Sequence, residues 1–246
     1  MMIDPLHQFM ITPLIKLNLA GYDVSFTNSS LFMVLATLSS IGLMYAATCR
    51  PQLVPTRIQF IGESLHRFVS QMITDNVGKE GLPYLPYMMS LFLFVLMGNF
   101  LGMIPYGFTF TSHIIVTFVL ALIVFISVTI LGLIKHGTHF LRLFCPAGTP
   151  IYIIPLLVPV EIMSYFTRPV SLSVRLFANM MAGHAMLKIF AGFVIILAGT
   201  KLFPVAALPF VVNLAVVGFE FLVAFLQAYV FTVLTCIYLN DAIHLH

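Results

Sequence analysis

The sequence has very little charge. Only 8% of its 246 residues are charged, whereas soluble domains average about 25%. Because so few charged side chains cannot cover a water-facing surface, the composition argues against a soluble enzyme and against a disordered protein. A total of 11 basic residues and a net charge of +3 are also too few for a nucleic-acid-binding patch. The hydrophobic fraction of 61% indicates an integral membrane protein instead.

Motifs for redox, metal or nucleotide chemistry are also lacking. The cysteines, Cys49, Cys145 and Cys236, lie far apart and have neither metal-ligand nor redox spacing. No set of His, Cys and carboxylate residues has metal spacing, and no glycine-rich phosphate loop occurs. We therefore expect no metal, no cofactor and no catalytic site of its own in this chain. The N-terminus also lacks the pattern of a cleaved signal peptide.

Long apolar runs predict an all-α, polytopic membrane protein of about five to six helices, organised as a single membrane domain over residues 1–246. The first span is expected at 30–48, after a polar cluster that can cap a helix. Residues 84–134 predict a membrane hairpin. Between them, 55–79 carry apolar residues at helical spacing, which indicates an amphipathic helix on the membrane surface or against a partner.

The C-terminal part combines a proline-rich segment with two long apolar runs. Prolines interrupt residues 146–168, so we expect a loop or a broken, re-entrant segment there. Residues 169–239 then predict a pair of helices, each on the order of 45–50 Å long against a hydrocarbon core of about 30 Å. Such helices must tilt strongly or protrude. Basic residues follow the first and third spans, which places the N-terminus outside.

Ionisable side chains occur within this apolar C-terminal part. A charge at bilayer depth costs at least about 2.5–3.5 kcal/mol, so such residues usually face a cavity, a partner or one another. A turn near Lys201 would bring His184 beside Glu220, and Arg175 beside Gln227. For Lys188, snorkelling or local pairing explains the charge as well as a functional role does.

The residue types suggest proton chemistry. Histidine and glutamate side chains can both gain and lose protons near physiological pH when their environments shift them, so His184 and Glu220 could form a relay, with a purely structural buried pair as the alternative. Arg175 cannot deprotonate in practice, which makes it a fixed cation for a partner's carboxylate. It lies about 180° around the helix from His184, so the two should face different surroundings. Asn99 could simply hydrogen-bond a neighbouring helix.

One stretch in this region, PVSLSVRLFANMMAGH at residues 169–184, closely resembles the signature of the subunit a family of F-type ATP synthases. Three further stretches agree with it: GNFLGMIP at 98–105, QAYVFTVLT at 227–235 and YDVSFTNS at 22–29. The resemblance implies a proton-conducting stator subunit with two offset half-channels, coupling proton flow to rotation of a ring. The implied partners are the subunit c ring, peripheral-stalk subunit b, other ATP synthase subunits and membrane lipids.

The resemblance also implies individual roles. Arg175 matches the essential cation that faces the ring carboxylates. His184 and Glu220 match the half-channel from the proton-rich outer side, and Glu161 the channel on the inner side. The polar neighbours of the arginine would be Asn179 and Gln227. The implied location is a bacterial or a mitochondrial inner membrane.

Two other classes of function fit the composition. A secondary transporter with a buried, charged substrate site would show internal repeats and a central cavity, and no clear repeat stands out in the sequence. A structural membrane scaffold would tolerate substitution of Arg175. Proton is favoured over sodium as the ion, because the sequence lacks a site rich in carboxylates and hydroxyls.

Overall fold

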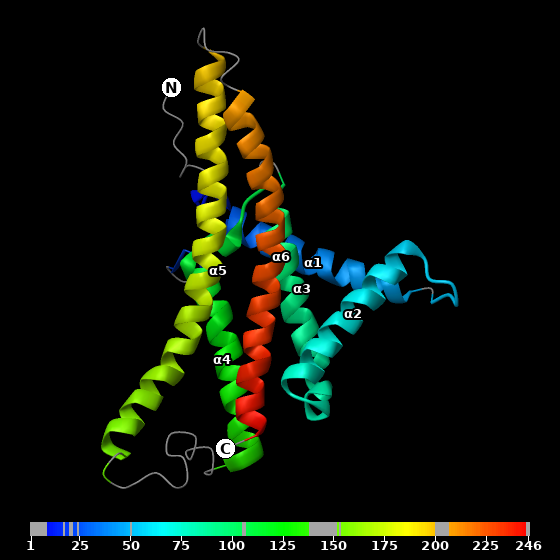
Figure 1. The fold of residues 1–246 in the computed structure, drawn as a ribbon, viewed down its shortest axis with the longest axis vertical. Coiled ribbons are helices and arrows are strands. Elements are labelled where there is room, and N and C mark those ends of the chain that lie inside the picture. Colours follow the sequence, from blue (N-terminus) through cyan, green and yellow to red (C-terminus); the bar gives the residue numbers. More distant parts are fainter. Residues whose placement is uncertain are drawn as a thin grey trace. The chain divides into compact units, whose positions relative to one another are not determined.

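The computed structural model describes residues 9–16, 18–19, 22–23, 25–49, 51–104, 107–137, 152, 154–199 and 207–244. Contacts divide the chain into two compact units. Unit 1 consists of Met1–Met44, Leu93–His113 and Leu176–Ala228, and unit 2 consists of Tyr45–Phe92, Ile114–Arg175 and Tyr229–His246. Four helices, α1, α3, α5 and α6, labelled in Figure 1, each contribute residues to both units.

Five helices in the described part of the chain are long and apolar enough to cross a membrane. They contain α1 (Asn28–Thr48), α3 (Leu85–Gly102), α4 (Ile114–His136), α5 (Ile154–Ala198) and α6 (Ala207–Ile243). Helix α1 begins where the polar cluster predicts, because the Thr27 hydroxyl accepts a hydrogen bond from the backbone N–H of Ser30. The all-α, polytopic fold predicted from the apolar runs is confirmed.

The remaining α-helix, α2 (Arg57–Asn76), is amphipathic, in agreement with the polar and apolar spacing of its sequence. Thr56 caps it, accepting a hydrogen bond from the backbone N–H of Gln59. Val69, Met72 and Ile73 are buried within unit 2, whereas the charged residues of α2 are exposed. The chain then turns at Gly78, whose φ of 83° favours glycine, into the short 3₁₀ helix η2 (Lys79–Tyr84).

Helix α5 corrects the prediction of a broken segment at 146–168. Residues 154–168 are helical, and α5 continues through Pro159 and Pro169 to Ala198; residues 146–151 and 153 lie outside the described part. Pro159 lies close to the helix start, and a membrane helix tolerates an interior proline when neighbouring groups satisfy the freed carbonyl. At 45 residues, α5 is about 68 Å long, and α6, at 37 residues, is about 56 Å long.

Short strands precede α1, which the apolar pattern did not predict. Strand β1 (Pro13–Ile15) pairs antiparallel with β4 (Phe26–Thr27), and β2 (Asn18–Leu19) pairs with β3 (Tyr22–Asp23). Asn28, the first residue of α1, connects the helix to the chain just before β1. Its side-chain amide donates a hydrogen bond to the carbonyl of Met10 and accepts one from the N–H of Thr12. These strands are too short to carry a hydrophobic alternation, so only their pairing defines them.

Two polar clusters hold the helices of unit 2 together. In one, Arg168 of α5 forms an ion pair of 2.7 Å with Asp241 of α6 and lies over the rings of Tyr165 and Tyr238. Thr129 of α4 hydrogen-bonds the hydroxyl of Tyr165. A planar guanidinium group can bind a carboxylate and aromatic faces together, so Arg168 joins α5 to α6, while Tyr165 joins α5 to α4.

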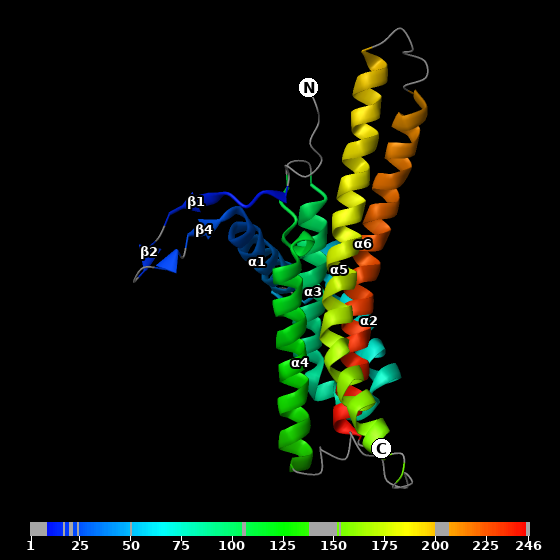
Figure 2. The ribbon, with the colours of Figure 1, turned by 90° about the vertical axis from the view of Figure 1, so that its left-hand side faces the viewer.

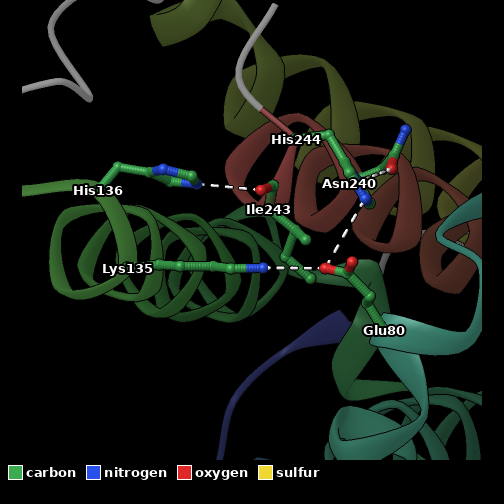
Figure 3. A network of polar contacts seen from close by, with 6 residues as sticks. All are labelled: Glu80, Lys135, His136, Asn240, Ile243 and His244. Atoms are coloured by element: carbon green, nitrogen blue, oxygen red, sulfur yellow. Dashed lines mark hydrogen bonds and ion pairs between the residues drawn. The ribbon is translucent and has the colours of Figure 1, made fainter.

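The second cluster lies at the end of α6 (Figure 3). Glu80 of η2 lies 3.0 Å from Lys135 of α4 and 3.8 Å from His244, just after α6. His136 also hydrogen-bonds the carbonyl of Ile243. Such exposed ion pairs contribute little energy individually, but here they connect the ends of three elements that lie far apart in sequence.

Candidate functional site

A buried histidine and a buried glutamate face each other in unit 1. His184 lies on α5 and Glu220 on α6, and the parts of these helices in unit 1 run side by side in Figures 1 and 2. Nδ1 of His184 contacts Oε1 of Glu220, and the two residues are 8% and 2% exposed. The pairing expected from the antiparallel turn is therefore confirmed, although the turn at Lys201 lies outside the described residues.

The close approach of the two helices depends on Gly183. A Cβ atom at that position would lie 2.8 Å from Oε1 of Glu220. Only glycine leaves that space free, so the backbone of α5 can lie against the carboxyl group. The other oxygen, Oε2 of Glu220, is buried without a hydrogen-bond partner among the described residues. A buried, half-satisfied carboxyl is the kind of group that exchanges a proton.

A loop between α3 and α4 completes the surroundings of His184. Thr109 places its hydroxyl on Nε2 of His184, so that both ring nitrogens have partners. Thr111 donates to Oδ1 of Asn99 at 2.9 Å, and Nδ2 of Asn99 donates to the carbonyl of Ala224 on α6 at 3.1 Å. The prediction that Asn99 bonds a neighbouring helix is confirmed.

A groove of about 630 Å³ opens between α5 and α6 within unit 1. Asn179 and Gly183 line it from α5, and Glu220 and Gln227 line it from α6, among mainly apolar side chains. Asn179 and Gly183 are four positions apart, and Glu220 and Gln227 seven apart, so each pair occupies one face of its helix. The groove therefore brings three of the predicted polar residues, Asn179, Glu220 and Gln227, to one opening.

Arg175 and Glu161 both lie in the part of α5 that belongs to unit 2. Arg175 is exposed, and none of the ion pairs between described residues includes it. Because His184 is buried, the two face different surroundings, as their spacing predicts. Glu161 is half-buried. The predicted approach of Arg175 to Gln227 remains a prediction.

Thr109 and Thr111 could not be selected as site residues from the sequence alone. Hydroxyl residues are common in loops, and nothing in the spacing of residues 107–113 indicates which helix they meet. Within the described residues no group of three or more His, Cys, Asp and Glu side chains could hold a metal ion. Hydroxyl, imidazole and carboxyl groups, which meet at this site, can pass protons to one another.

The five candidate membrane spans among the described residues, together with the buried histidine–glutamate pair and the polar-lined groove of unit 1, define a multi-pass membrane protein that translocates ions. Residues 30–240 match the family described as ATP synthase A chain. The chain belongs to this family, the proton-translocating stator subunits of F-type ATP synthases.

Curated relatives agree over the whole chain. The ATP synthase subunit a of Rhodospirillum rubrum is 55% identical over 245 residues, covering 100% of both chains. The subunit a of Parvibaculum lavamentivorans is 51% identical, covering 98% of this chain and 94% of its own. That of Agrobacterium fabrum is 50% identical, covering 98% of each. This chain accordingly works within the ATP synthase complex, as a multi-pass protein of the bacterial inner membrane. A secondary transporter is not favoured.

Proposed function

We propose that His184 and Glu220 form the proton inlet of this stator subunit and deliver protons to the carboxylates of a rotating ring of subunit c. The observation that carries the proposal is the buried contact between Nδ1 of His184 and Oε1 of Glu220, with Oε2 of Glu220 lacking a partner among the described residues. A carboxyl group in this setting can accept a proton from the imidazole and pass it on. The groove that Glu220 lines supplies a route by which protons can leave the carboxyl group.

Arg175 is the fixed cation of the proposal. Its exposure on an apolar helix, with no ion pair among the described residues, supports a role toward a partner. A guanidinium group holds its charge at any physiological pH, so it attracts an ionised carboxylate and cannot pass a proton itself. A ring carboxylate that meets Arg175 therefore loses its proton on one side before it is reprotonated on the other.

Protonation of the ring carboxylates and the membrane potential together explain how proton flow drives rotation. A neutral carboxyl group enters lipid far more cheaply than a carboxylate, so a ring site turns into the lipid only after it gains a proton. The membrane potential contributes about 2.3 kcal/mol per charge for each 100 mV. The chain thus performs no covalent chemistry, and its output is rotation of the neighbouring ring.

The other assignments follow the family resemblance. Glu161 would belong to the half-channel on the inner side, and its half-buried position on α5 is compatible with access to water. Asn179 and Gln227 would be polar neighbours of the path at the groove. Peripheral-stalk subunit b would hold this subunit still while the ring turns.

Substitution of the two charged residues tests the proposal. In the assembled complex in vesicles, Arg175→Ala should abolish ATP-driven proton pumping, and Glu220→Gln should lower passive proton conduction by about tenfold or more. Glu63→Gln, which removes an exposed carboxylate from α2, is the control and should conduct normally. Normal pumping by Arg175→Ala, or normal conduction by Glu220→Gln in a fully assembled complex, would refute the respective role.

A further inference from the structure

The loop between α3 and α4 contributes a hydroxyl group, that of Thr109, which hydrogen-bonds Nε2 of His184 in the proposed proton inlet. We propose that Thr109 is a positioning residue for proton transfer, because its hydroxyl holds the ring of His184 in the orientation that presents Nδ1 to Glu220. The inference rests on the proposed function of His184 and Glu220. It adds a third side chain, from an element other than the two long helices.

The hydrogen-bonding inventory explains why a hydroxyl group is suited to this position. An ionised Glu220 can only accept, so Nδ1 of a neutral His184 carries the proton, and Nε2 accepts from the Thr109 hydroxyl. When the imidazole is protonated, Nε2 becomes a donor, and the same hydroxyl rotates to accept. Thr109 therefore satisfies the outer nitrogen in both protonation states. Since Thr109 is only 4% exposed, bulk water has little access to replace it.

Two glycines of α3 fix the position of Thr109. A Cβ atom on Gly102 would lie 2.3 Å from Oγ1 of Thr109, and one on Gly98 would lie 2.4 Å from the ring of Phe110. The two glycines are four positions apart, so they share one face of α3 and leave room there for the loop. The fully buried Phe110 packs over Gly98, and Thr109 packs over Gly102.

Hydrogen bonds hold the same loop from its other end. The Ser112 hydroxyl donates to the carbonyl of Thr109 at 2.6 Å. Thr111 is bonded to Asn99, which in turn donates to the carbonyl of Ala224 on α6. The loop is thus connected to α3 and to α6, which carries Glu220. Such restraint keeps a side chain within the narrow geometry that proton transfer requires.

Isosteric removal of the hydroxyl tests the inference. The complete ATP synthase, carrying Thr109→Val, is reconstituted in vesicles, and passive proton conduction is driven by an imposed potential. Loss of a hydrogen bond to a buried imidazole should lower conduction by about tenfold. Thr109→Ser, which keeps the hydroxyl, should recover most of this loss. The matched control is Thr235→Val, because the hydroxyl of this buried threonine bonds only the carbonyl of Phe231 in its own helix among the described contacts.

A double-mutant cycle separates positioning from general stability. If Thr109 acts through His184, Thr109→Val should cause no further loss in a His184→Ala background. Additive losses, equal conduction by Thr109→Val and wild type, or failure of Thr109→Ser to recover conduction would each overturn the inference. If His184→Ala and Glu220→Gln conduct normally, the proposed inlet itself is wrong and the inference falls with it. A loss in those variants without a loss in Thr109→Val rejects the inference alone.

Discussion

At the scale of single residues, the buried histidine and glutamate of the site are partners of each other, whereas the exposed arginine has no ion pair among the described residues. His184 and Glu220 satisfy each other inside unit 1, so much of their burial cost is offset within the subunit. Arg175 has no ion pair among the described residues and is exposed on an apolar helix. Lipid is an unfavourable environment for such a cation, which supports the role toward a partner carboxylate that we propose for Arg175.

The loop histidine His113 provides a prediction on pH. Burial lowers the pKa of His113 from its ordinary value of 6.5. The unfolded chain therefore takes up a proton at a higher pH than the folded chain, and stability is lost as the pH falls below about 6.5. His113→Gln should lessen the drop in unfolding temperature of the purified complex between about pH 7.5 and about pH 5.5. His66→Gln, at an exposed position of α2, is the control. An undiminished drop in the His113 variant would contradict this account.

At the scale of elements, the site depends on how closely helices and loops approach one another. Gly183 brings α5 against Glu220, and Gly98 and Gly102 bring the loop at Thr109 against α3. Glycine in a helix interior costs roughly 0.5–1 kcal/mol relative to alanine. Gly183 and Gly102 allow contacts with polar side chains of the proposed proton path, whereas Gly98 leaves room for the ring of Phe110, which explains why small residues are useful at these positions.

A substitution at Gly183 tests this close approach. The Cβ atom of Gly183→Ala would lie 2.8 Å from Oε1 of Glu220, which forces the carboxyl group or the helix to move. We expect proton conduction to fall by about tenfold or more, since small displacements at a transfer site have large effects on rate. Gly218→Ala on α6 is matched, because its Cβ meets nothing within 4 Å, and it should conduct normally. Equal conduction by the two variants would show that proton conduction does not depend on the close approach of α5 to Glu220.

At the scale of the whole molecule, the membrane topology follows from the five candidate spans found among the described residues. If each crosses the membrane once, the two ends of the chain lie on opposite sides. Arg57 and Arg67, between α1 and α3, and Lys135, in the last turn of α4, then fall on the same side, and the positive-inside rule makes that side cytoplasmic. The described part of the loop between α3 and α4, by contrast, contains no Lys or Arg.

Labelling from the two sides of the membrane checks this topology. In a chain without its native cysteines, a cysteine at Ile11 should react with an impermeant reagent added outside, and a cysteine at His244 only with reagent added inside. Both positions are exposed, so accessibility does not limit the reaction. Labelling of both cysteines from one side would require an even number of crossings and would exclude the five-span arrangement.

The sequence by itself determined which segments cross the membrane and which residues carry charge inside it. Long apolar runs are a property of local composition, and the pairing of His184 with Glu220 follows from counting along two antiparallel helices. Local composition did not determine that α5 continues through Pro159 and Pro169, because whether a proline interrupts a membrane helix depends on what its neighbours supply. Only the tertiary structure showed that Thr109 hydrogen-bonds His184 and that Thr111 hydrogen-bonds Asn99. A contact between a loop and a helix produces no periodic pattern in the sequence from which it could be predicted.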